Sequence, residues 1–88
     1  MKLNKNYIVK NLADETILVH QDEHNVDFTK IINLNEVAVV IINKIQEGLN
    51  ANEIGKYIAS EYDVDELTAT KDAEEFIKKL IESGIVEE

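Results

Sequence analysis

Apolar and polar positions alternate in short runs over the first third of the chain. Residues 7–10 (Tyr-Ile-Val-Lys) and 16–20 (Thr-Ile-Leu-Val-His) are rich in β-branched residues, and the connector between them carries Asn and Asp. This pattern is typical of a β-hairpin. A polar, turn-rich segment over residues 21–27 then precedes a further apolar run. The strands are expected at about residues 6–11, 16–21 and 28–34.

The next apolar segment carries conflicting local signals. Residues 37–42 form a β-branched run, which by propensity alone would be a buried strand. Asn35, however, is a suitable N-cap, Glu36 is favourably placed against a helix dipole, and Gly48 supplies a C-terminal stop. The wider apolar pattern also has three- and four-residue steps and therefore favours a helix. Its members are Leu34, Val37, Ala38, Ile41, Ile45 and Leu49.

Two further helices are predicted from caps and periodicity. Asn50 and Glu53 have the spacing of a capping box, and Asp65 can cap a last, longest helix that ends before Gly84. The first two helices are separated by only a few residues, as in a helix-turn-helix pair. Residues 85–86 either form a short final strand or pack back on the core. The helices are expected at about residues 35–47, 51–61 and 66–83.

The last helix has an apolar face that is wider than a single neighbour requires. Its inner stripe is Ala69, Ala73, Phe76 and Leu80, and a second column follows Leu67, Thr70, Glu74, Ile77 and Ile81. At 3.6 residues per turn, the two columns are roughly a quarter to a third of a turn apart. The extra width has two explanations: packing against both a sheet and another helix, or the wall of a groove.

Together, these elements predict an α+β fold of winged-helix-turn-helix-like layout, with a three-stranded antiparallel sheet followed by three helices. Eighty-eight residues are enough for one domain, expected to cover residues 1–88. A chain of this size buries only about 60–65% of its unfolded surface and has little core to spare for an enclosed catalytic cavity. The absence of cysteine excludes disulfides, thiolate metal sites and thiol nucleophiles.

Charge argues against nucleic acid as a partner. The net charge is −9, the chain has no arginine, and residues 36–88 carry thirteen acids against five lysines. Affinity for nucleic acid comes largely from cationic side chains that displace counterions. No apolar run of signal-peptide length follows the basic N-terminus, and no apolar run approaches the roughly 20 residues of a membrane span. The sequence therefore predicts a soluble, cytoplasmic protein with no membrane partner.

Residues that could carry catalysis are few. His20 and His24 are four positions apart, but they lie in a strand end and a loop, and no third ligand stands out. No nucleophile motif or glycine-rich phosphate loop is present, and acids adjacent in sequence are better explained as a solvated surface. We therefore expect no enzyme activity, no metal site and no cofactor.

Four pieces of the sequence resemble the PqqD-like family. They are the strand-to-helix junction at residues 32–38 (Ile-Asn-Leu-Asn-Glu-Val-Ala), residues 61–65 (Glu-Tyr-Asp-Val-Asp), residues 72–76 (Asp-Ala-Glu-Glu-Phe) and residues 80–86 (Leu-Ile-Glu-Ser-Gly-Ile-Val). Each piece is an apolar pattern with a few turn residues, but their order and spacing are specific. The resemblance covers nearly the whole chain.

The resemblance implies a stand-alone recognition module for ribosomally made, post-translationally modified peptides. Members of that family bind the leader of a precursor peptide and present it to a modifying enzyme, such as a radical SAM protein, a cyclodehydratase or a leader peptidase. The leader would add as a strand to the edge of the third strand, and its side chains would enter the groove between that strand and the third helix. The implied peptide-binding residues are Thr29, Lys30, Ile31, Ile32 and Asn33 at the edge, and Leu67, Thr70, Lys71, Glu74, Ile77 and Lys78 at the groove.

Several points stay open at the level of sequence. Either Ile31 or Ile32 faces the groove, because a one-residue slip in register exchanges them. Self-pairing through the same edge would give an edge-to-edge homodimer. Two other functions fit the order of elements: a winged-helix DNA-binding regulator, which the acidic last helix disfavours, and a scaffold subunit that binds a folded protein through its acidic helices.

Overall fold

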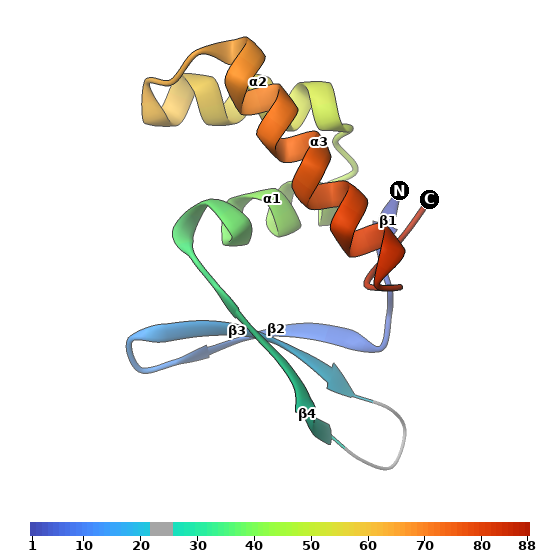
Figure 1. Ribbon diagram of the computed structural model, residues 1–88. Coiled ribbons are helices and arrows are strands. Elements are labelled where there is room, and N and C mark those ends of the chain that lie inside the picture. Colours follow the sequence, from blue (N-terminus) through green and yellow to red (C-terminus); the bar gives the residue numbers. More distant parts are fainter. Residues whose placement is uncertain (22–25) are drawn as a thin grey trace.

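The computed structural model describes residues 1–21 and 26–88, and the side chains of residues 1–21 and 32–88. It confirms the expected fold class, because a three-stranded antiparallel sheet precedes three helices (Figure 1). The sheet has the order β2-β3-β4. Its strands are β2 (Tyr7–Leu12), β3 (Glu15–Gln21) and β4 (Val26–Leu34), and the helices are α1 (Glu36–Gln46), α2 (Ala51–Tyr62) and α3 (Glu66–Glu82).

Side-chain caps define where the helices begin. The Asn50 side chain accepts a 2.9 Å hydrogen bond from the Glu53 amide, and the Glu53 carboxylate accepts one of 3.0 Å from the Asn50 amide, so the predicted capping box is confirmed. Such caps satisfy amides that have no partner in the first helical turn. Residues 37–42 are helical despite their β-branched composition. The other two predicted caps, Asn35 and Asp65, also accept from amides three residues later.

A second, two-stranded sheet joins the ends of the chain, which lie close together in Figure 1. β1 (Lys2–Leu3) pairs antiparallel with β5 (Val86–Glu87). Residues 85–86 are therefore both packed on the core and, at Val86, part of a strand. Periodicity could not predict β1, because two residues carry no pattern.

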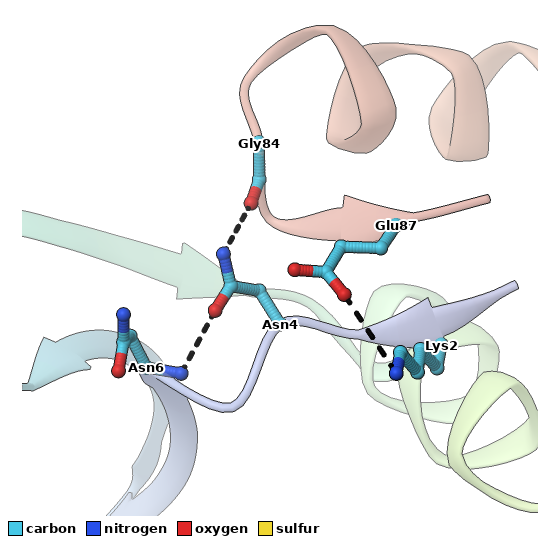
Figure 2. A network of polar contacts seen from close by, with 5 residues as sticks. All are labelled: Lys2, Asn4, Asn6, Gly84 and Glu87. Carbon is cyan, nitrogen blue, oxygen red and sulfur yellow. Dashed lines mark hydrogen bonds and ion pairs between the residues drawn. The ribbon is translucent and has the colours of Figure 1, made fainter.

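Asn4 ties this junction to the rest of the molecule (Figure 2). Its side-chain amide donates a 3.0 Å hydrogen bond to the Gly84 carbonyl, and its side-chain oxygen accepts one of 2.9 Å from the Asn6 amide. Lys2 and Glu87 add an exposed ion pair at 3.9 Å. Because exposed ion pairs contribute little stability, the junction is stabilised by the β1–β5 pairing, the hydrogen bonds of Asn4 and the burial of Val86.

The main core lies between the sheet and the helices. From the sheet, Leu18 is fully buried in it, and directly opposite residues of an antiparallel pair share a face. Val9 and Ile32 are the cross-strand neighbours of Leu18, so they belong to the helix-facing side of the sheet. Ile17 and Val19 lie on the opposite face, and they are nonetheless buried, outside the main cluster. The helical part of the core comprises Ile41, Ile42, Ile45, Ile54, Ile58, Ala69, Ala73, Ile77 and Leu80.

Candidate functional site: an open strand edge and an apolar groove

β4 lies at the border of the three-stranded sheet. β3 pairs with one of its edges, and within the described part of the chain no strand pairs with the other. Unpaired N–H and C=O groups along such an edge are free to bond an added strand. The sheet has a second border at β2, so position in the sheet alone does not select β4.

The register of β4 divides the predicted edge residues into two groups. Ile31, Ile32 and Asn33 pair regularly with Val19, Leu18 and Ile17. Beyond Val19 the register shifts, since the next pair is His20 with Asp27, and residues 28–30 fall within this irregularity. The side chains of Thr29, Lys30 and Ile31 lie outside the described residues. The regular end of the strand is therefore the end that leads into α1.

The register also resolves a point that the sequence left open. Ile32 is opposite Leu18, whose side chain is buried among the helices, so Ile32 belongs to the helix-facing side. Its side chain is nevertheless 38% exposed. An apolar side chain on this side of an edge strand, with more than a third of its surface uncovered, is available to a peptide that adds to β4.

An apolar groove opens where β4 ends. Asn35, which links β4 to α1, lies at its border, and the groove continues between the first half of α1 and the first half of α3 as a cavity of about 350 Å³. Val37 and Val64 line it and are 37% and 44% exposed. Half-exposed apolar side chains around a hollow are typical of binding surfaces. The full lining is Asn35, Val37, Ala38, Ile41, Ile58, Tyr62, Val64, Thr68, Ala69, Asp72, Ala73 and Phe76.

Tyr62 lies where this groove meets a second, more polar hollow along β3, the end of β4 and α1. Desolvation and the nearby Glu36 carboxylate raise the pKa of Tyr62 above its ordinary value near 10. The phenol therefore stays protonated throughout the physiological range. It lies at the end of α2, close to Glu36 of α1, and forms part of one wall of the groove.

The structure places the predicted α3 residues away from this groove. Thr70 lies against Gly55 of α2, since a Cβ added at Gly55 would be 2.5 Å from the Thr70 Cα. Glu74, Ile77 and Lys78 line a different, shallower hollow beside the first residue of α2. None of the six predicted residues lines the groove between α1 and α3: Leu67 and Lys71 are exposed, Leu67 by 79%, and Ile77 is buried in the core.

The predicted α3 residues and the groove between α1 and α3 lie on different sides of that helix. The helix is rotated so that Ile77 is buried and Phe76 is half-buried at the groove, whereas the inner stripe was expected to contain Phe76. Neighbouring residues on a helix point 100° apart, and both are apolar, so periodicity could not rank them. Val64 sits in the turn between α2 and α3, where no periodic signal exists.

Other kinds of site are not evident in the part of the chain that the structure describes. No three His, Asp or Glu side chains among those residues are grouped as metal ligands. The His20 ring packs edge-on against Tyr7 at 5.0 Å between ring centroids, and His24 lies outside the described residues. No helix of residues 1–21 and 26–88 is long and apolar enough to cross a membrane.

Comparison with known families agrees with the resemblance noted in the sequence. The family model described as coenzyme PQQ synthesis protein D (PqqD) matches residues 15–86. The chain therefore belongs to the PqqD family. The match covers the three-stranded sheet from β3 onward and all three helices. No curated protein sequence matches the chain.

Two solved structures share the fold over almost the whole chain. One is TbiB1 in complex with the TbiA(beta) leader peptide, with a TM-score of 0.78 and 26% sequence identity over 99% of this chain and 95% of that one. The other is lasso peptide synthetase B1 complexed with the leader peptide, with a TM-score of 0.77 and 20% identity over 96% and 93%. At 20% identity, the second likeness concerns the fold.

Proposed function

We propose that this chain binds the leader segment of a ribosomally made precursor peptide. The observation that carries the proposal is the likeness, over 99% of the chain, to TbiB1, which was solved with a leader peptide bound. Membership of the PqqD family supports it. The open edge of β4 and the apolar groove that begins at Asn35, directly after that strand, supply the surface that an extended peptide requires.

The leader adds to β4 as a fourth strand of the sheet. Main-chain hydrogen bonds to the edge supply affinity that tolerates differences in peptide sequence, and side chains that enter the neighbouring groove supply selectivity. The regularly paired residues Ile31–Asn33 are the core of this edge, with Thr29 and Lys30 extending it. Ile32 contributes an apolar side chain on the helix-facing side.

The groove between α1 and α3 receives the leader side chains. This assignment replaces the Leu67–Lys78 column of α3 by the lining residues Val37, Val64 and Phe76. The reason is continuity, because Asn35 and Val37 follow β4 directly in the chain and lie at the groove border. Leu67 remains a useful comparison because it is an exposed apolar residue of the same helix outside the groove.

The chain acts as a binding module and not as a catalyst. We propose that residues 1–88 form one recognition domain that presents the leader to a separate modifying enzyme, such as a radical SAM protein, a cyclodehydratase or a leader peptidase. In the absence of a peptide, the same β4 edge is available to a second copy of the chain, so homodimer formation and peptide binding compete. Exposed edges of this kind pair with one another unless they are protected.

A pair of matched substitutions tests the placement of the groove. Val64→Asp puts a carboxylate into the apolar lining and should weaken binding of the leader peptide about tenfold or more, equivalent to about 1.4 kcal/mol. Leu67→Asp makes the same chemical change three residues later, outside the groove, and should leave affinity within about twofold. Calorimetric titration with a synthetic leader peptide that the wild-type chain binds measures both.

The same titrations can contradict the proposal. If Leu67→Asp abolishes binding and Val64→Asp does not, the peptide lies on the α2 side of α3. If the wild-type chain binds no leader peptide, the function itself is wrong. Both positions are more than a third exposed, so the folded state should tolerate either change. Circular dichroism of each variant checks this directly.

A further inference from the structure

The polar side chains that line the groove are few, and most are engaged within the protein. The Asn35 side-chain oxygen accepts a 2.8 Å hydrogen bond from the Ala38 amide. The Thr68 hydroxyl lies 3.3 Å from the Asp65 carboxylate, to which it donates. Tyr62 lies beside Glu36. These groups form part of the walls, and Asn35 and Thr68 take part in helix caps.

Asp72 differs from the other polar residues of the lining. It is the only charged side chain among the lining residues, it is exposed, and among the described residues it has no hydrogen bond or ion pair. It stands on α3 between Ala69 and Phe76, both of which line the apolar part of the groove. A single carboxylate beside an apolar hollow is a recognition element for a cation next to an apolar group.

The spacing between the apolar hollow and the Asp72 carboxylate can be compared with the spacing of side chains in an extended peptide. Residues three or four apart on a helix are about 5–6 Å apart at their Cβ atoms, which is the spacing from Asp72 to its apolar neighbours. In a strand, side chains two residues apart point to the same side and are separated by roughly 7 Å. Two side chains on the same side of a bound strand therefore have about the separation of the apolar hollow and the Asp72 carboxylate beside it.

We infer that this chain selects leader peptides in which a lysine or arginine stands two positions from an apolar anchor residue, with the basic side chain paired to Asp72. The inference rests on the proposed function and adds the chemistry of the peptide that the site prefers. The chain's charge of −9, with no arginine, acts in the same direction by attracting basic peptides over distance.

The test is a selection from a display library of 12-residue peptides randomised at every position, using the full 88-residue chain as bait. Peptides enriched by the wild-type chain should carry Lys or Arg two positions from an apolar residue. With Asp72→Lys as bait, the enriched residue at that position should change to Asp or Glu. Glu74→Lys is the matched control, since it makes the same change of net charge on α3 outside the groove, and it should keep the basic preference.

Individual peptides from the selection give a second, quantitative test. Asp72→Asn should weaken binding of the basic peptide roughly two- to fivefold, the range of an exposed ion pair. It should also flatten the dependence of affinity on salt between 50 and 300 mM NaCl, whereas Glu74→Gln should leave both unchanged. Replacing the basic residue of the peptide by norleucine should remove the difference between the wild type and Asp72→Asn.

The outcomes separate the two proposals. Enriched peptides that bind at β4 but show no basic preference, or the same preference with Asp72→Lys, overturn this inference and leave the proposed function in place. Equal losses of affinity for the basic peptide in Asp72→Asn and Glu74→Gln also overturn it, because the loss would then come from the change in net charge. The absence of any enriched peptide with the wild-type chain overturns the proposed function as well.

Discussion

Tyr62 is the residue whose ionisation should be visible in the stability of the protein. Its pKa is raised by desolvation and by the Glu36 carboxylate, so the folded state holds the phenolic proton more tightly than the unfolded chain. The unfolded chain therefore loses this proton first as the pH rises past about 10. The contribution of Tyr62 to the free energy of unfolding should be constant below that pH and should fall as the pH rises from there toward the folded pKa.

Urea denaturation of the wild type and of Tyr62→Phe between pH 8 and 11 measures this contribution. The other tyrosines and the lysines titrate in both proteins, so the difference between the two curves isolates Tyr62. The stability lost by the wild type above pH 10 should exceed that lost by the variant. Parallel curves across the whole range would mean that neither desolvation nor Glu36 raises the pKa of Tyr62 in the folded protein.

At the scale of single positions, the sequence predicts helix caps better than it predicts which side chains of an element face the core. Asn35, Asn50 and Asp65 could be identified as caps because a cap depends on residues three positions apart. The choice between Phe76 and Ile77 could not be made, because it depends on where α1 and α2 lie. For the same reason, alternation in β3 could not show that Leu18 enters the main core.

At the scale of elements, the contact between α2 and α3 depends on the absence of a side chain at Gly55. A Cβ at that position would lie 2.5 Å from the Thr70 Cα, so the two helices could not keep their present distance. Gly55→Ala would gain about 1 kcal/mol of helix propensity. Overpacking costs typically about 1–3 kcal/mol, and a clash with backbone belongs to the upper half of that range, so the substitution should destabilise the protein by about 1–2 kcal/mol net.

Chemical denaturation of Gly55→Ala checks this balance, with Gly55→Ala/Thr70→Ala as a partial rescue. The rescue should be incomplete, because the closest contact that remains is with the Thr70 backbone. A Gly55→Ala variant as stable as the wild type would show that α2 and α3 are less closely packed than described. This contact also explains why Thr70, which was predicted at the groove, lies on the opposite side of α3.

The order of elements could be predicted from the sequence, but the smallest elements and the groove between α1 and α3 could not. Three strands and three helices follow from apolar periods and caps that extend over at least six residues each. β1 and β5 are two-residue strands that exist only because the chain ends meet. The groove is likewise a product of assembly, because Val37 and Val64 come from separate parts of the chain and are joined only by folding.

At the scale of the whole molecule, the sheet offers two borders, and the account depends on which one receives the peptide. β2 and β4 both lack a further strand partner in the described part of the chain. Only β4 runs directly through Asn35 into the apolar groove. The position of Ile32 on the helix-facing side of β4 is consistent with a peptide held between that strand and the helices.

The most direct measurement is amide hydrogen exchange, followed by NMR, of the chain with and without a saturating leader peptide. Amides that form a new inter-strand hydrogen bond exchange more slowly. The account predicts slower exchange on binding at alternate amides of β4 within Ile31–Asn33, with no change along the outer edge of β2. Slower exchange along β2, or an unchanged β4 in the peptide complex, would contradict it.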